Sequence, residues 1–182
     1  DPKSWIDSVM EEDRQKVLSA IPDQIVDSTE IIFPEYRIVQ PTGEIRWIFA
    51  RAYPVIDENN TVSRVVGIAE DITNRKQSVE ELNRIFELSP DLIGFGNVTK
   101  GYYTRVNPAY EIFGWPLDEF LTRPYVDFIH PDDHNATANI VTTMQSGQSI
   151  SGFVNRYRCK DGSYRTIEWR ATEAQPDGSV CV

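Results

Sequence analysis

The hydrophobic pattern of the chain changes its period once near the middle, between Val65 and Pro90. Val65–Ile72 is short, apolar and rich in β-branched residues, which is typical of a buried strand. From Thr73 onward, apolar residues recur at the three- and four-residue spacing of a helix whose opposite face is charged. Pro90 ends this pattern, because proline disfavours helical geometry in the residue before it. The pattern predicts a strand that leads directly into a linker helix over residues 74–88.

The sequence repeats itself on either side of this linker, and such a repeat decides how the whole chain is organised. It consists of two pairs of segments in the same order: WIDSVMEED (5–13) with YVDFIHPDD (125–133), and RIVQPTGEIR (37–46) with RYRCKDGSYR (156–165). The offset is 120 residues in the first pair and 119 in the second. Matching glycine and arginine positions predict two copies of one module, over residues 1–73 and 89–182.

Each copy shows part of one plan of strands and helices. In the second copy the pattern predicts strands over 92–97 and 102–106, short helices from Ala109 and Leu117, a helix that ends near Gln145, and strands over 150–159 and 163–174. Asn107 is expected to cap the first of these helices. In the first copy the pattern predicts a helix over 11–20 and strands over 30–40, 44–55 and 62–72. The first copy thus lacks the opening strands of the plan, and the second lacks the last strand.

Four blocks of residues resemble the PAS family of sensory modules, whose C-terminal portion is called PAC. They are NPAY with FG (107–110 and 113–114), FIHPDD (128–133), RYRCKDGSYR (156–165) and, in the first copy, GIAEDITNRK (67–76). The resemblance covers nearly the whole chain and implies the α+β fold class, a five-stranded antiparallel sheet with small helices on one face, enclosing a pocket. It implies two copies, of which the first is reduced to its PAC portion. Asp71–Thr73 then resembles the exit motif, where an aspartate satisfies backbone groups as strand becomes helix.

Alternation along the late strands indicates which side chains face the interior. Positions that are apolar in both copies are Ile48, Ala50 and Ala52, aligned with Ile167, Trp169 and Ala171. Asn155 would be a polar group in an apolar cavity, where such groups orient ligands. The candidate pocket residues of the second copy are Tyr110, Phe113, Phe128, Met144, Asn155, Tyr157 and Trp169, with Phe95, Val106 and Phe153 as further candidates. A filled core explains the same side chains.

The opposite face of the same strand differs between the copies. It carries Trp47 and Phe49 in the first copy but Thr166 and Glu168 in the second. A pair of large aromatic side chains on a surface marks a contact site. We therefore expect the linker helix or a partner to cover Trp47 and Phe49.

Some PAS relatives carry chromophores or metals. A covalent flavin adduct needs a cysteine in an Asn-Cys-Arg-type motif, whereas Cys159 and Cys181 lie on late strands. Haem binding would need a histidine that faces inward from the long helix, but His134 lies in its first turn. We expect neither group. Non-covalent flavin stays open, because Trp, Asn and Tyr side chains can hold its ring, although no residue demands it.

Composition and charge exclude several classes of function. The 182 residues include 18 basic and 28 acidic side chains, and the net charge of −10 disfavours an electrostatic nucleic-acid surface. The two cysteines form no metal-ligand series, and no apolar run reaches the roughly 20 residues that span a bilayer. Neither His130 nor His134 is spaced with a nucleophile for catalysis. We expect a non-enzymatic, cytoplasmic segment that contacts neither nucleic acid nor membrane.

The sequence predicts a sensory or regulatory module that detects a small ligand, a redox state or a partner. Its linker helix would transmit the signal to an output domain in the same chain. The output domain that we expect first is the histidine kinase of a two-component system. The alternatives are the sensor segment of a diguanylate cyclase or phosphodiesterase, and a ligand-free PAS dimerisation scaffold. We also expect a homodimer through the linker helix and PAS surfaces, and the apolar stripe of this helix is Val79, Leu82 and Phe86. Otherwise this stripe packs on Trp47 and Phe49.

Overall fold

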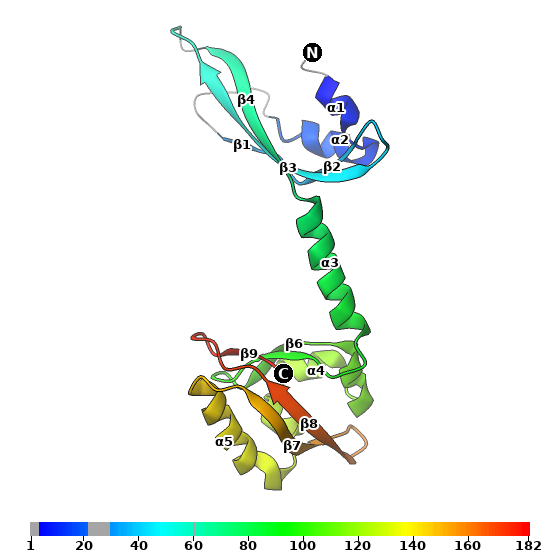
Figure 1. Ribbon diagram of the computed structural model, residues 1–182, viewed down its shortest axis with the longest axis vertical. Coiled ribbons are helices and arrows are strands. Elements are labelled where there is room, and N and C mark those ends of the chain that lie inside the picture. Colours follow the sequence, from blue (N-terminus) through cyan, green and yellow to red (C-terminus); the bar gives the residue numbers. More distant parts are fainter. Residues whose placement is uncertain (1–3, 22–29, 60) are drawn as a thin grey trace. The chain divides into compact units, whose positions relative to one another are not determined.

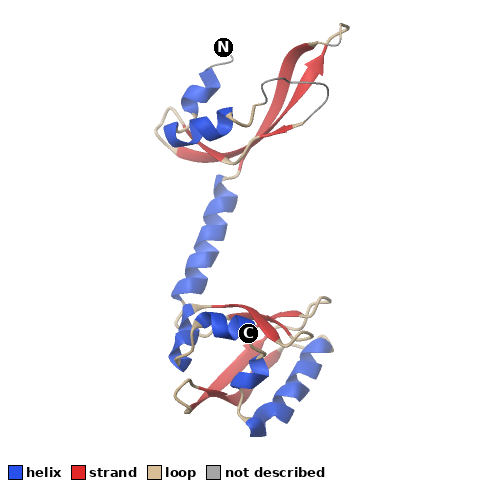
Figure 2. Ribbon diagram, turned by 180° about the vertical axis from the view of Figure 1, so that it is seen from behind, coloured by secondary structure: helices blue, strands red, loops and turns tan. Residues whose placement is uncertain are grey.

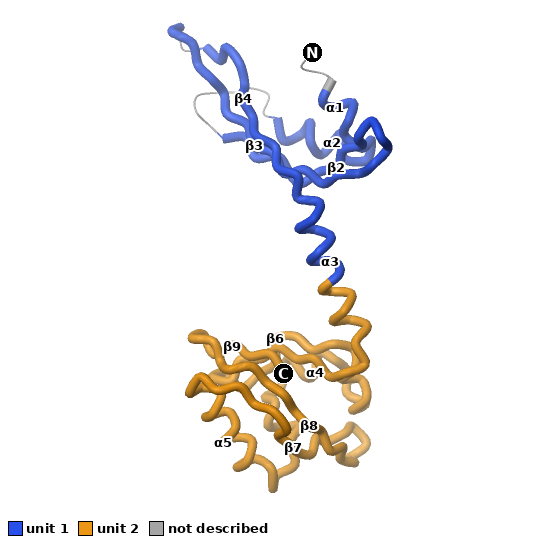
Figure 3. The backbone as a smooth tube through the Cα atoms, viewed as in Figure 1, with its two compact units in different colours: residues 1–81 blue, residues 82–182 orange. Residues whose placement is uncertain are grey.

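The computed structural model describes the chain in three stretches, residues 4–21, 30–59 and 61–182. The chain divides into two compact units, residues 1–81 and 82–182 (Figure 3). The division falls within helix α3 (Thr73–Leu88), which is the linker helix expected over residues 74–88. Each unit therefore holds one copy of the repeat and one part of the linker. Residues 1–3 and 22–29 of the predicted first copy lie outside the described residues.

Unit 1 packs two helices, α1 (Ser4–Ser8) and α2 (Glu11–Leu18), against a four-stranded antiparallel sheet (Figure 1). The long strand β3 (Ile45–Ile56) pairs with β1 (Ile31–Ile32) and β2 (Tyr36–Val39) along one side and with β4 (Val62–Asp71) along the other. As the alternation predicts, Ile48, Ala50 and Ala52 are buried, and they share a core with Val9 and Val17 from the helical side.

The strand expected over residues 30–40 is interrupted, so that β1 and β2 are separate. Phe33 still donates its N–H to the carbonyl of Ala50 at 3.0 Å, but Pro34 follows and has no N–H to donate. The prediction of one continuous strand is therefore wrong at this point. Helix α1 has no counterpart among the predicted elements.

Unit 2 contains all five strands of the plan. Strand β5 (Gly94–Asn97) lies between β6 (Tyr102–Val106) and β9 (Ser179–Cys181), and β7 (Ile150–Arg158) pairs with β8 (Tyr164–Ala171). Just beyond β8, Thr172 donates its N–H to the carbonyl of Cys181 at 2.9 Å, which continues the order as β6-β5-β9-β8-β7. This arrangement confirms the five-stranded antiparallel fold. The expectation that the second copy lacks its last strand is wrong, because β9 is present with three residues.

The helices of unit 2 lie on one side of its strands (Figure 2). They are the 3₁₀ helices η1 (Pro108–Phe113), η2 (Tyr125–Phe128) and η3 (Pro131–Asp133), and the α-helices α4 (Leu117–Thr122) and α5 (His134–Gln145). Tyr110, Phe113, Phe120 and Phe128 from these helices are fully buried. The stacked rings of Phe120 and Phe128 are 4.5 Å apart. These four rings are the aromatic core of unit 2.

The repeat in the sequence is also a repeat of contacts. Asp13 accepts hydrogen bonds from the backbone N–H, Nε and Nη2 of Arg37, each at 2.9 Å. Asp133 accepts the same three bonds from Arg156, at 2.9, 2.9 and 2.7 Å. Through these bonds Arg37 lowers the pKa of Asp13, and Arg156 lowers the pKa of Asp133 to about 2. Each pair joins the helical side to a strand and so fixes the same packing in both copies.

Candidate functional site

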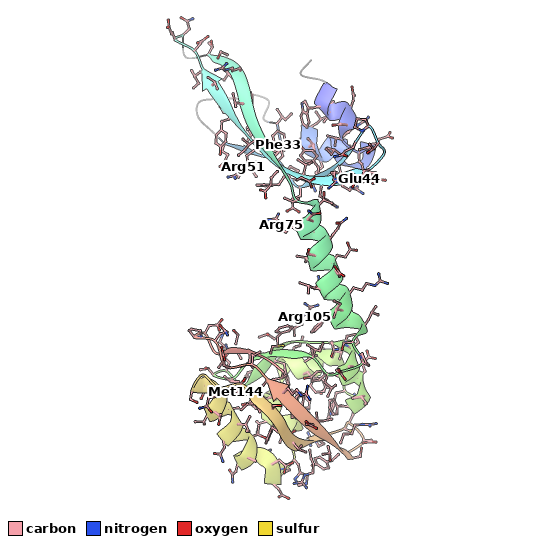
Figure 4. All side chains as sticks on the ribbon, in the orientation of Figure 1. Phe33, Glu44, Arg51, Arg75, Arg105 and Met144 are labelled. Carbon is pink, nitrogen blue, oxygen red and sulfur yellow. The ribbon has the colours of Figure 1, made fainter. Side chains whose placement is uncertain are left out.

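Unit 2 contains a cavity of about 80 Å³ between the inner face of its strands and helix α5. Of the seven candidate pocket residues, Met144 (Figure 4), Asn155, Tyr157 and Trp169 line this cavity, and Phe153 from the further candidates does so too. The other three, Tyr110, Phe113 and Phe128, do not line it. They come from η1 and η2 and belong to the aromatic core, in which the ring of Phe113 lies 5.4 Å from that of Tyr157 on the cavity wall.

The remaining two candidates lie elsewhere. Val106 is buried in the hydrophobic cluster that contains the aromatic core. Phe95 lies on the outer face of β5, because it is exposed between the buried residues Gly94 and Gly96. The interpretation of Phe95 as a pocket residue is therefore wrong.

The sequence prediction omits most of the helical side of the cavity. Thr137, Ile140, Val141 and Met144 of α5 all line it, at the i, i+3, i+4, i+7 spacing of one helix face. Of these four, only Met144 is among the predicted residues. The spacing is a periodic signal from which the other three can be identified.

A chain of hydrogen bonds crosses the cavity wall. Trp169 donates its indole Nε1–H to Oδ1 of Asn155 at 2.7 Å, and Asn155 donates from Nδ2 to Oγ1 of Thr137 at 3.3 Å. Thr137 in turn donates to the backbone carbonyl of Asp133 at 2.9 Å. Because the amide of Asn155 is held at both its oxygen and its nitrogen, its orientation in the cavity is fixed.

The other polar groups of the cavity are neutral. The hydroxyls of Tyr103 and Tyr157 are 2.8 Å apart and share a hydrogen bond. Burial raises the pKa of Tyr103 and raises that of Tyr157 well above its ordinary value, so both keep their protons at neutral pH. No charged side chain is among the described residues that line the cavity.

The size of the cavity bears on the cofactors considered above. Pockets for drug-sized ligands measure about 300–1,000 Å³, so a cavity of about 80 Å³ is too small for a flavin ring or for haem.

Within residues 4–21, 30–59 and 61–182, no three His, Cys, Asp or Glu side chains gather as a metal site requires. In the same part of the chain, no helix combines the length and the apolarity needed to cross a membrane.

The start of α3 is bonded to the sheet of unit 1. Ile72, which is almost fully buried, donates its N–H to the carbonyl of Trp47 at 2.9 Å, and Trp47 donates its own N–H to Oγ1 of Thr73 at 2.8 Å. Asp71 accepts from the N–H of Thr73 at 2.9 Å and lies 3.4 Å from Arg46. The hydrogen bonds to Thr73 lower the pKa of Asp71. The expectation that Asp71 satisfies backbone groups where strand becomes helix is confirmed.

Cationic side chains cover the outer aromatic residues of unit 1. Nζ of Lys76, in the first turn of α3, lies 4.9 Å from the ring of Trp47, and Arg37 lies 5.6 Å from the same ring. Arg51 lies 5.5 Å from the ring of Phe49. The linker helix therefore helps to cover Trp47, as expected, although it does so through a lysine and not through its apolar stripe.

The end of α3 is bonded to the outer face of β5 and β6 in unit 2. Phe86 is only 6% exposed, and its ring lies 5.8 Å from that of Phe95. Arg105 (Figure 4) lies 3.8 Å from the ring of Phe86 and reaches Asn83 and Glu87, each at 3.3 Å. The assignment of Phe86 to the stripe that pairs with a partner helix or packs on Trp47 and Phe49 is therefore wrong, because Phe86 anchors the helix to unit 2.

Asn107 completes this attachment. The sequence predicts that its side chain caps η1, and this prediction is wrong. The side chain bonds instead to the segment that follows α3. Its Oδ1 accepts from the N–H of Ile93 at 3.0 Å, and its Nδ2 donates to the carbonyls of Asp91 at 2.8 Å and Ser89 at 3.3 Å. Asn107 is 0% exposed, so these bonds compensate for the burial of its amide.

Comparison with known proteins agrees with this description. A family model described as the PAS fold matches residues 1–69 and 103–182. Among curated proteins, the probable diguanylate cyclase DgcE of Escherichia coli (strain K12) is 30% identical over 170 residues. The match covers 88% of this chain but only 15% of that protein.

Two solved structures illustrate the similarity of fold. A domain of the sensory box sensor histidine kinase/response regulator from Geobacter sulfurreducens has a TM-score of 0.51 at 23% identity, over 60% of this chain and 95% of that one. The PAS domain of an HTR-like protein from Haloarcula marismortui has a TM-score of 0.51 at 20% identity, over 59% and 90%. Since the family model matches segments of both copies, the chain belongs to the PAS fold family.

Proposed function

We propose that this chain is a sensory segment of a larger signalling protein and that α3 carries the signal between its two copies. The relative DgcE is named a probable diguanylate cyclase, and the Geobacter structure comes from a sensor histidine kinase/response regulator. An output domain of the same protein, a histidine kinase or alternatively a cyclase, would receive the signal. The segment would act in the cytoplasm, where the nucleotide substrates of such outputs are found.

One observation carries this proposal: α3 is attached to a sheet at each of its ends. Thr73 bonds to Trp47 at its start, and Phe86 packs under Arg105 at its end. A shift of either sheet therefore changes the contacts of the helix. A molecule in the cavity of unit 2 causes such a shift only if it binds one arrangement better than the other.

Filling the cavity tests this coupling. Ala171 lines the cavity, and we expect Ala171→Leu to force a rearrangement of the strands. Amide hydrogen exchange in residues 82–88 of α3, followed by mass spectrometry, should then change by about threefold or more. Ala138→Leu, at an exposed position of α5, is the control. Unchanged exchange in α3 of a folded Ala171→Leu protein would contradict the coupling.

A homodimer through α3 is also part of the proposal. The apolar side chains that α3 leaves 55–70% exposed are Val79, Leu82, Ile85 and Leu88. Exposed apolar stripes of this kind mark contact surfaces, and a second copy of the helix would bury this one. A ligand-free dimerisation scaffold, the second candidate function, would use the same stripe.

The substitution Leu82→Glu tests the dimer. A buried, unpaired carboxylate is costly at an apolar interface, so the variant should dimerise at least about tenfold more weakly in sedimentation equilibrium. Arg84→Glu, also exposed on α3, introduces the same side chain and should have little effect. A Leu82→Glu protein that sediments as the wild-type dimer would remove the helix-pairing idea.

A further inference from the structure

The two copies differ at the three positions that form the polar network of the cavity. By the repeat alignment, Thr137, Asn155 and Trp169 of unit 2 correspond to Val17, Tyr36 and Ala50 of unit 1. The pairing registers agree with this alignment, because Asn155 pairs with Ile167 as Tyr36 pairs with Ile48. The same three places in the fold can therefore be compared directly.

The substitutions remove the network and compensate one another in volume. Val17 and Ala50 have no polar side-chain atom, so these three positions of unit 1 cannot form such a chain of hydrogen bonds. A larger Tyr36 stands where unit 2 has Asn155, and a smaller Ala50 stands where it has Trp169. Val17, Tyr36 and Ala50 are all buried and belong to the core of unit 1. Tyr36 and Ala50 also line a hollow of about 520 Å³ in unit 1. At these positions unit 2 holds an oriented amide, whereas unit 1 has none.

The amide of Asn155 has bonding capacity to spare. A primary amide has two N–H donors and an oxygen that accepts twice. Among the described residues, one N–H binds Thr137 and one acceptor position receives Trp169. Asn155 is only 4% exposed and lines the cavity, so its other N–H is available to a molecule inside it. That molecule must offer a hydrogen-bond acceptor.

Size and charge restrict the molecule further. A cavity of about 150 Å³ holds benzene, so the cavity of about 80 Å³ holds a body smaller than benzene, of at most about five non-hydrogen atoms. A charged molecule would pay a large desolvation cost, because no charged side chain is among the described lining residues. The rest of the wall is apolar, with Ile140, Val141 and Phe153 among its members.

We propose that unit 2, and not unit 1, binds a small neutral molecule with one carbonyl or hydroxyl oxygen on a short apolar body, because only unit 2 has the oriented amide at these positions. Asn155 receives the oxygen, and Trp169 and Thr137 hold the amide in position. The ligand class refines the proposed function. The consequence of binding, a signal through α3, rests on that function, whereas binding itself does not.

Butanone and propionate make a matched pair of probes, because each has five non-hydrogen atoms but only propionate is charged. Indole N–H signals in NMR spectra of the whole chain report on Trp5, Trp47, Trp115 and Trp169 separately, once each is assigned by a Trp→Phe substitution. Butanone should shift the Trp169 signal saturably and leave those of Trp5 and Trp47 in place. Propionate should shift none of them. Butanone shifts of equal size in unit 1, or a response to propionate alone, would overturn the proposal.

Asn155→Leu removes the amide at similar volume and should weaken butanone binding by about tenfold. Tyr36→Phe in unit 1 should leave binding unchanged. If Asn155→Leu does not fold, Thr137→Val removes only the acceptor that orients Nδ2 and should weaken binding severalfold. Undiminished affinity in a folded Asn155→Leu or Thr137→Val protein would show that the polar network takes no part.

The outcome separates binding from signalling. If butanone shifts Trp169 but Ala171→Leu leaves the exchange of α3 unchanged, the ligand class stands and the proposed transmission fails. If Ala171→Leu alters exchange in α3 and butanone does not bind, the transmission stands and the ligand class fails.

Discussion

Replacing Phe128 with alanine should lower the free energy of unfolding of unit 2 by about 3–5 kcal/mol, the usual cost of removing a buried phenylalanine side chain. Phe128 is 0% exposed and stacks on Phe120 at 4.5 Å, with Trp115 edge-on at 5.8 Å. The cavity left by alanine would be closed in by large rings, which cannot easily collapse into it.

Urea denaturation followed by hydrogen exchange of peptides from residues 89–182 measures this loss for unit 2 by itself. A single unfolding transition of the whole chain would not measure the loss for unit 2, because the two compact units need not unfold together. Ile112→Ala is the control, since Ile112 belongs to the same unit but is 51% exposed. A loss below about 1 kcal/mol in Phe128→Ala would contradict the assignment of Phe128 to the core.

Replacing Asn107 with leucine should destabilise unit 2 by about 2–5 kcal/mol. The substitution keeps the volume but leaves the N–H of Ile93 and the carbonyl of Asp91 without their side-chain partner, and an unsatisfied buried group costs about 1–3 kcal/mol. Because Asn107 binds the segment directly after α3, the loss should also loosen the attachment of the helix to unit 2.

The same exchange measurement separates the two effects. The amide of Ile93 should exchange faster under native conditions in Asn107→Leu, before any change in the strands β7 and β8. Asn139→Leu is the control, because Asn139 is exposed on α5. Equal stability and equal exchange at Ile93 would mean that the bonds of Asn107 contribute nothing.

Much of the fold can be predicted from the sequence because the same pattern of elements occurs in both copies of the repeat. The alignment of Asp13 with Asp133 and of Arg37 with Arg156 appears in the structure as the same set of bonds. Two of the errors have identifiable causes. Pro34 interrupts a strand that hydrophobicity alone extends, and β9 consists of three residues whose partner β5 lies far away in the sequence.

The candidate site is only partly predictable, for a physical reason. Strand alternation correctly places Asn155, Tyr157 and Trp169 on the wall of the cavity. Hydrophobicity does not distinguish a residue that lines a cavity from one that fills a core, since both are buried. Phe113 of η1, a candidate pocket residue that lies in the core, shows this. Arg105 acts through contacts with α3, and Asn107 acts through bonds to the segment that follows it. No local pattern contains either set of contacts.

Strand β4 has a consequence for any work with this segment. Within the described residues it pairs with β3 alone, and Val65, Val66 and Ile68 are exposed along it. In unit 2 the corresponding last strand β9 has neighbours on both sides. A strand with one free side is a template for backbone pairing with another molecule. Backbone addition at β4 would thus be a route to self-association chemically unlike the proposed side-chain contact at α3, and only the latter would respond to Leu82→Glu.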